Sequence, residues 1–225
     1  MRIWAITNQK GGSGKSTLAT QLAALAEQEG QPCCLIDLDQ QTSAACWSAR
    51  RETKPKQSKQ PMVIAAMPEK LPELISAAAT FECKLVLIDT ASKIDASALA
   101  AMRVSSLIIC PTLASLFDMH ALADTVRLLE LADKKGSAVV VVNRVPENKA
   151  EETIAQAAAA VASAGVKVAP VYVCDRPQFA AAIQKGKGVT ESRTKTKAAD
   201  EIRELWTYLD KLSNKLAKAT KEPAE

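Results

Sequence analysis

The feature that most constrains this chain is a glycine-rich segment near its start, Asn8-Gln-Lys-Gly-Gly-Ser-Gly-Lys-Ser-Thr17. It follows the apolar run Ile3-Trp4-Ala5-Ile6 and precedes a helical pattern, so the order is strand, loop, helix, which is the context of a phosphate-binding loop. The glycines let successive backbone N–H groups turn toward an anion, and the N-terminus of the next helix adds its dipole at the same point. The alternative interpretation is an ordinary glycine-rich turn with charges nearby.

The residue types in this segment define the ligand that it would hold. Lys15 is long enough to reach terminal phosphates as a mobile point charge, and the Ser16 hydroxyl is placed to bind Mg²⁺. Where the usual pattern has glycine, this chain has Gln9, and a second lysine, Lys10, follows it. The nucleotide-binding residues expected in the segment are Gly11, Gly12, Ser13, Gly14, Lys15, Ser16 and Thr17.

A loop with a lysine at each end of its glycines resembles the deviant Walker A motif of the ParA/MinD family of ATPases. The resemblance implies ATP and Mg²⁺ as ligands and a catalytic role for both lysines. It also implies that Lys10 crosses a dimer interface to the nucleotide of the partner subunit. A late segment resembles the same family, because Arg176-x-x-Phe-x-x-Ala182 is followed by Gly186-x-x-Val-x-Glu191. This second match lies far from the loop and favours ParA proper.

Apolar runs alternate with helical patterns along the rest of the chain. Strands are expected at 2–8, 33–39, 85–89, 107–110, 139–142 and 166–173, with Pro111 ending the fourth. Helices are expected at 16–29, 69–80, 95–103, 118–134, 149–164, 177–185 and 198–218, and an exposed loop at 50–61. Continuous apolar strands need cover on both sheet faces. We therefore predict an α/β fold in a single domain over 1–225, a mostly parallel twisted sheet with helices on both faces, as in P-loop NTPases.

Polar residues follow the predicted strands, at the sheet edge where ligands bind in such folds. Asp89 ends the apolar run Leu85-Val-Leu-Ile, and beside a phosphate loop this arrangement predicts a Mg²⁺ ligand opposite Ser16. Asp89 could instead cap the next helix. Asn143 and Arg144 follow the fifth strand, and they resemble the adenine-contacting position of the family, although a polar residue after a strand is common.

Asp39 lies in the segment Asp37-Leu-Asp-Gln-Gln41, which resembles a family segment whose second aspartate positions or activates the attacking water. The resemblance implies that Asp39 takes part in catalysis and in the metal site; capping of a helix is the alternative. Gln40 stands where the family usually has proline, so we expect hydrolysis to survive with a less rigid loop.

Two basic stretches stand out from a net charge of only +4. Residues 50–59 and 185–197 each carry five basic groups and one acid, and each is either a solvated loop or part of an electrostatic footprint for nucleic acid. In ParA-like dimers, basic residues near the C-terminal helices bind DNA without sequence preference. The resemblance therefore implies salt-dependent contacts to DNA phosphates from Lys185, Lys187, Arg193, Lys195 and Lys197.

The last predicted helix, 198–218, carries one apolar stripe that docks on the domain or, as in MinD-like relatives, binds a membrane. Its polar, proline-broken end favours docking. The first residues belong to a predicted strand, which leaves no room for a signal peptide, and no apolar run approaches the roughly 20 residues that span a bilayer. The six cysteines form no C-x-x-C pair, which excludes zinc-site spacing and fits a reducing cytosol.

Together these features predict a ParA-like partition ATPase. ATP would join two subunits, the homodimer would bind bulk DNA of the nucleoid, and a ParB-like or other adaptor on the cargo would stimulate hydrolysis. The alternatives are a MinD-like ATPase at a membrane surface, an iron–sulfur reductase and a small-molecule kinase. The reductase would need cysteines aimed at a shared cluster, whereas Cys83 and Cys110 lie in or near strands. No motif identifies the cargo.

Overall fold

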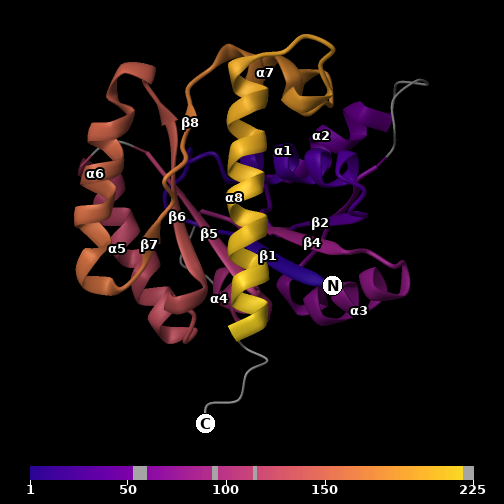
Figure 1. Cartoon of the computed structure of the whole chain (residues 1–225). Coiled ribbons are helices and arrows are strands. Elements are labelled where there is room, and N and C mark those ends of the chain that lie inside the picture. The colour runs from indigo at the N-terminus through magenta and orange to yellow at the C-terminus, as the bar shows by residue number, and fades with distance from the viewer. Residues whose placement is uncertain (53–59, 93–95, 114–115, 220–225) are drawn as a thin grey trace.

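A sheet of eight strands forms the centre of the computed structural model, which describes residues 1–52, 60–92, 96–113 and 116–219 (Figure 1). The strands are β1 (Arg2–Ile6), β2 (Cys33–Asp37), β3 (Met62–Ala65), β4 (Leu85–Asp89), β5 (Leu107–Thr112), β6 (Ala138–Val145), β7 (Lys167–Val168) and β8 (Val173–Cys174). Their order is β3-β2-β4-β1-β5-β6-β7, β8 also pairs with β6, and every pairing is parallel. The predicted parallel sheet is confirmed.

Helices cover both faces of this sheet. They are α1 (Lys15–Gln28), α2 (Ser43–Glu52), α3 (Leu71–Thr80), α4 (Ala96–Val104), α5 (Leu116–Leu131), α6 (Ala150–Val161), α7 (Pro177–Gln184) and α8 (Lys197–Ala219). Successive residues of a strand point to opposite faces, so Trp4 and Ile6 of β1 pack with α1, α2, α7 and α8, whereas Ala5 packs with α3, α4 and α5. Because helices bury both faces of the sheet, the side chains on both sides of each strand are apolar.

Helix α8 lies across the face of the sheet to which Trp4 and Ile6 contribute (Figure 1). Its apolar stripe, including Ile202, Leu205 and Leu209, is buried in the core. The indole N–H of Trp4 donates to the Ser213 hydroxyl at 3.0 Å, so the middle of β1 is tied to the second half of the helix. None of the helices in the described part of the chain is long and apolar enough to cross a bilayer.

Two elements of the structure, α2 and β3, were not predicted from the sequence. The loop expected at 50–61 is wrong at its start, because α2 continues to Glu52; residues 53–59 lie outside the described residues. Helix α2 is polar overall, and β3 is a four-residue edge strand that is only half-buried. The sequence of α2 therefore lacks the apolar periodicity of a helix, and the four-residue apolar run of β3 is too short to identify a strand by periodicity alone.

Strand β5 continues through Pro111 to Thr112, which corrects the prediction that Pro111 ends it. The carbonyls of Ile109 and Pro111 accept hydrogen bonds from Thr7 N and the Asn8 side chain, at 2.9 and 2.6 Å. The nitrogen of Pro111 points to the same side as its carbonyl, and β1 has already ended there, so no ladder bond is lost.

Other predicted strand ends also move. The strands predicted at 2–8 and 33–39 end at Ile6 and Asp37, so Asn8 and Asp39 lie in loops beyond them. The strand predicted at 166–173 is two short strands, β7 and β8, which pair at different points along β6.

Candidate functional site

The glycine-rich loop joins β1 to α1 at the carboxyl edge of the sheet. Gly14 has a φ of 89°, a conformation that residues with a side chain rarely adopt. A Cβ at this position would also lie 2.2 Å from Nδ2 of Asn143. That same amide nitrogen donates to the Ser13 carbonyl at 2.7 Å, and Asn143 is buried. Asn143 therefore fixes the loop from strand β6, two strands away from β1, and its predicted contact with the base remains a prediction.

Lys15 begins α1 and is buried with its ammonium inside the loop. Its Nζ donates to the Ser92 hydroxyl at 2.6 Å and to the Lys10 carbonyl at 3.3 Å. Burial lowers the pKa of Lys15, and the nearby charges of Asp89 and Asp39 oppose this shift. A buried ammonium in the first turn of a helix favours the binding of an anion.

Asp89 ends β4 beside the loop and is fully buried. Neither of its carboxylate oxygens has a hydrogen-bond partner among the described residues. Burial raises the pKa of Asp89 to about 7, the charges of Asp37 and Asp39 add to the shift, and Ser16 and Lys15 act against it. A carboxylate without partners costs free energy unless a proton or a cation satisfies it. This oxygen donor set, with the Ser16 hydroxyl, fits Mg²⁺.

The two aspartates at the end of β2, Asp37 and Asp39, have different roles in the structure. Asp37 is buried, and its carboxylate accepts the backbone N–H groups of Asp39, Ala44 and Ala45 at 2.9 to 3.1 Å, so it holds the start of α2. Asp39 is half-exposed and accepts the N–H of Gln41 at 3.0 Å. The start of α2 is thus capped by Asp37, and Asp39 faces the cavity.

A cavity of about 590 Å³ opens along the loop. The residues that line the cavity come from distant parts of the chain, because β1, β2 and β6 all end at this edge of the sheet. The predicted residues that line it are Gly12, Gly14, Lys15, Ser16, Thr17, Asp39, Asn143 and Arg144. Among the described residues, Lys10, Gly11, Ser13 and Asp89 lie next to the cavity without forming its lining. Ser92, Asp175, Arg176 and Phe179 also line it, and the site predictions did not include them.

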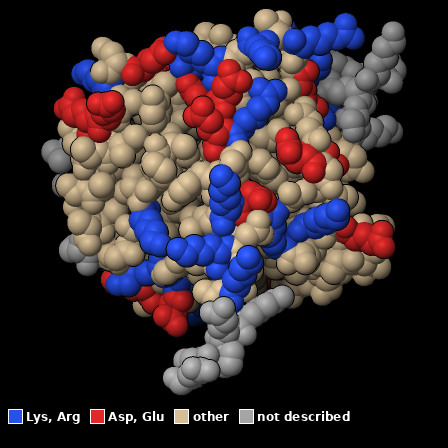
Figure 2. Space-filling view, in the orientation of Figure 1, with Lys and Arg blue, Asp and Glu red and all other residues tan. Residues whose placement is uncertain are grey.

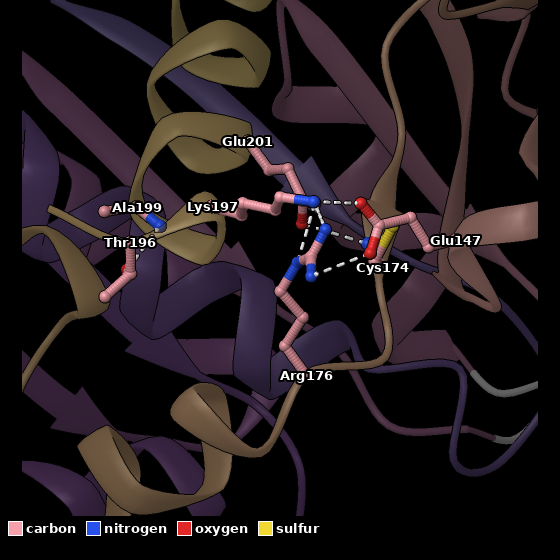
Figure 3. Close-up of polar contacts among 7 residues, drawn as sticks. All are labelled: Glu147, Cys174, Arg176, Thr196, Lys197, Ala199 and Glu201. Atoms are coloured by element: carbon pink, nitrogen blue, oxygen red, sulfur yellow. Dashed lines mark hydrogen bonds and ion pairs between the residues drawn. The ribbon is translucent and has the colours of Figure 1, made fainter.

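Arg176 lies at the far end of the cavity in a polar network (Figure 3). Its guanidinium donates to Oε1 of Glu201 from Nε and Nη2, at 2.8 and 2.7 Å, and approaches Glu147 at 3.4 Å. Glu201 also accepts the backbone N–H of Cys174 at 3.1 Å, and Glu147 pairs with Lys197. The network joins the segment after β6, the segment after β8 and the start of α8. Arg176 stood in a recognised motif, whereas Glu201 had no signal beyond a polar helix position.

Arg51, the second residue of the first basic stretch, lies inside the molecule. Its side chain is 1% exposed and forms a bidentate pair with Glu191, at 2.5 and 2.7 Å. It also donates to the Gly186 carbonyl at 3.0 Å and lies 5.2 Å above the Trp47 ring. Arg51 is therefore a tie between α2 and the 186–191 segment, and it is not part of a solvated basic loop.

The five residues predicted to contact DNA lie from the end of α7 to the start of α8. Lys185, Arg193, Lys195 and Lys197 are exposed, and Lys187 is half-buried. Figure 2 shows Lys and Arg near α7 interleaved with Asp and Glu, and a further group of Lys and Arg over the lower half of α8. That half of the helix carries exposed Lys211, Lys215 and Lys218.

Comparison with known proteins bears on this site. The pattern that defines the CobQ/CobB/MinD/ParA nucleotide-binding domain matches residues 4–189. This chain belongs to that family. A curated relative is the maintenance of carboxysome distribution protein A of Gloeobacter kilaueensis, 30% identical over 167 residues, which are 69% of each chain. The ParA/MinD resemblance is thereby confirmed, and the chain is an ATP-binding P-loop protein from a family of ATPases.

Solved structures share the fold at lower identity. Apo McdA of Cyanothece is 15% identical with a TM-score of 0.66, over 98% of this chain and 99% of that one. MinD of Aquifex aeolicus is 15% identical with a TM-score of 0.71, over 100% and 99%. MinD of Pyrococcus horikoshii, complexed with Mg-ADP, is 19% identical with a TM-score of 0.70, over 96% and 99%.

Proposed function

We propose that the whole chain acts as one Mg²⁺-dependent ATPase domain, which dimerises on ATP and positions a cargo while bound to DNA. The observation that carries the proposal is that one edge of the sheet holds both a buried lysine and a buried carboxylate without a hydrogen-bond partner among the described residues. Lys15 supplies positive charge for phosphates, and Asp89 with Ser16 supplies oxygen ligands for a metal. These are the parts that phosphoryl transfer requires.

Each side chain in the cavity then has a role in ATP hydrolysis. Lys15 and the loop N–H groups hold the phosphates and neutralise charge as it develops on them. Ser16, Asp89 and Asp39 would hold Mg²⁺, which would neutralise negative charge on the phosphates. Asp39 lines the cavity, and its carboxylate would orient the attacking water. Asn143 and Arg144 line the same cavity, and we propose that they contact the base.

In the proposed dimer, Lys10 would act on the nucleotide of the partner subunit. Its backbone is fixed on both sides, because its N–H donates to Asn8 at 2.9 Å and its carbonyl accepts Lys15. Lys10 lies beside the cavity and not in its lining. We propose that its ammonium reaches the nucleotide of the partner subunit, as the family resemblance implies.

We propose that DNA is held through phosphate contacts by the residues of the second basic stretch. The strongest contributions are expected from Lys185, Arg193 and Lys195, which are exposed. Lys197 is engaged with Glu147, and Lys187 is half-buried, so smaller contributions are expected from these two. Such binding would be independent of sequence, would fall steeply with salt, and would associate the protein with the nucleoid in the cytoplasm.

The name of the curated relative concerns carboxysome distribution. We therefore propose a protein assembly as the cargo of this chain and a protein on its surface as the adaptor that stimulates hydrolysis. A plasmid or chromosome cargo, with a ParB-like adaptor, is the alternative. The membrane-surface function is less favoured, because the apolar stripe of α8 is buried against the sheet.

The experiment that tests the proposal is binding to a random-sequence DNA duplex with ATP, with ADP and without nucleotide, across a salt series. Binding that needs ATP and falls steeply with salt supports the proposal. A parallel series with anionic lipid vesicles tests the membrane alternative. Vesicle binding without DNA binding at low salt would replace the DNA-based function with the membrane-based one.

A further inference from the structure

We propose that Ser92 is a positioning residue for Lys15, which holds the lysine ammonium in the orientation that receives nucleotide phosphates. The inference rests on the nucleotide-binding function proposed above. Ser92 was not a predicted site residue, and it lies 77 residues away from Lys15 in the sequence. In space the two side chains lie on the same wall of the cavity.

The first observation is the contact itself. The ammonium of Lys15 donates to the Ser92 hydroxyl at 2.6 Å, which is its shortest hydrogen bond, and to the Lys10 carbonyl at 3.3 Å. An ammonium has three N–H donors. Two are therefore held by the protein, and among the described residues the third has no hydrogen-bond acceptor. Since Lys15 lines the cavity, this third donor is left for a ligand there.

The second observation is the rigidity of the support behind Ser92. Strand β4 pairs with β1 up to Asp89, and both the N–H and the hydroxyl of Thr90 donate to the Ile6 carbonyl, at 3.3 and 3.1 Å. Ser92 follows two residues later, and its side chain approaches the site of a Cβ at Gly11 to 3.9 Å. The hydroxyl thus lies against the loop, on a segment anchored to the same strand that carries the loop.

The third observation is the chemistry of the partner. A hydroxyl accepts a hydrogen bond from the ammonium without neutralising its charge, so Lys15 keeps its full attraction for an anion. A carboxylate at the position of Ser92 would compete with the phosphates for that charge. A serine therefore suits a residue that orients the lysine and leaves the charge available, which is pre-organisation of the site.

The test is a double-mutant cycle in which calorimetry measures Mg-ADP binding. The cycle compares the natural protein with Ser92→Ala, Lys15→Ala and the double variant. Both substitutions shorten side chains at the cavity wall, and the melting temperature of each variant is measured to confirm folding. We expect Ser92→Ala to weaken ADP binding about tenfold in the natural background and to have no effect in the Lys15→Ala background. Ser92→Thr, which keeps the hydroxyl, is expected to restore most of the affinity.

Two controls separate positioning from a general structural effect. AMP lacks the β-phosphate that the loop lysine reaches, so its affinity should not change in Ser92→Ala. Ser76→Ala makes the same chemical change on the exposed surface of α3 and should leave ADP affinity unaltered.

The outcomes distinguish the two levels of the argument. An unchanged ADP affinity in Ser92→Ala, or an equal loss in the Lys15→Ala background, overturns the role of Ser92 and leaves the nucleotide site intact. If Lys15→Ala itself binds ADP normally, the nucleotide site and the role of Ser92 both fail.

Discussion

At the scale of single residues, burial sets the chemistry of the site, and Asp89 is the clearest case. Its carboxylate is fully buried, and its pKa is raised from 3.8 to about 7. The folded protein therefore takes up a proton at a higher pH than the unfolded chain does. Between about pH 4 and pH 7 the folded state binds more protons, so this group makes the free energy of unfolding decrease as pH rises.

Replacing Asp89 by Asn removes this titration, and without Mg²⁺ we expect the variant to become more stable relative to the natural protein as pH rises from 4 to 7. The relative gain reaches at most about 4 kcal/mol, from 1.36 kcal/mol per pKa unit. Urea unfolding in EDTA at several pH values measures it. Asp133→Asn, on an exposed side chain, is the control and should show no such trend. A gain for Asp89→Asn that is independent of pH would contradict the assignment.

Between elements, the tie from Arg51 to Glu191 connects α2 to the segment that precedes α8. The guanidinium is buried, and Glu191 also accepts the backbone N–H of Gly188 at 2.7 Å. Gly186 packs against the backbone of α2 so closely that a Cβ there would lie 2.4 Å from the nitrogen of Arg51. The contact between α2 and the 186–191 segment therefore depends on the Arg51–Glu191 ion pair and on glycine at position 186.

Removal of Arg51 leaves Glu191 with a charge that has lost its partner in a mostly buried position. We expect Arg51→Ala to lower the free energy of unfolding by about 3–5 kcal/mol, as for other broken buried pairs. Arg103→Ala, on the exposed face of α4, should change it by less than about 0.5 kcal/mol. Denaturant unfolding measures both. If Arg51→Ala unfolds with the same free energy as the natural protein, the Arg51–Glu191 pair contributes nothing to stability.

The network around Arg176 joins the far wall of the cavity to α8. Because Glu201 holds both the guanidinium and the Cys174 N–H, its removal should loosen the wall where the base would lie. We expect Glu201→Gln to raise KM for ATP by about tenfold and to leave kcat within about twofold, since the phosphate end is untouched. Glu204→Gln, exposed on the same helix, is the control. A fall in kcat at constant KM would place the network at the reacting end.

The candidate site could be predicted from the sequence where its signal lies in neighbouring residues. The loop at 8–17 and Asp89 at the end of an apolar strand could be identified because each signal is local. Ser92, Arg51 and Glu201 could not be identified, because their partners lie 77, 140 and 25 residues away. For the same reason α2 was missed: contacts of Trp47 and Arg51 with the 186–191 segment hold it, and its own sequence is polar.

For the whole molecule, the strand order brings the site together. Strand β1 lies between β4 and β5, so the loop that follows it has Asp89 on one side and the Asn8–Pro111 contact on the other. Asn8 binds the backbone of Lys10 and accepts the Thr125 hydroxyl of α5 at 3.4 Å. The backbone at Lys10 is thus fixed to two strands and a helix, which form a rigid base for a side chain that is proposed to act across a dimer interface.

This arrangement makes the proposed dimer testable through Lys10 alone. Lys10→Ala keeps the loop glycines and Lys15, so we expect ATP binding within about threefold of the natural protein and loss of ATP-dependent dimerisation. Light scattering with ATP gives the mass, and calorimetry on the same samples gives the affinity. Lys10→Arg tests whether charge suffices, and Lys70→Ala, at an exposed residue that pairs with Glu73, is the matched control. A normal ATP-dependent dimer in Lys10→Ala would show that the lysine does not act across subunits. Loss of ATP binding together with the dimer would place it in the site of its own subunit.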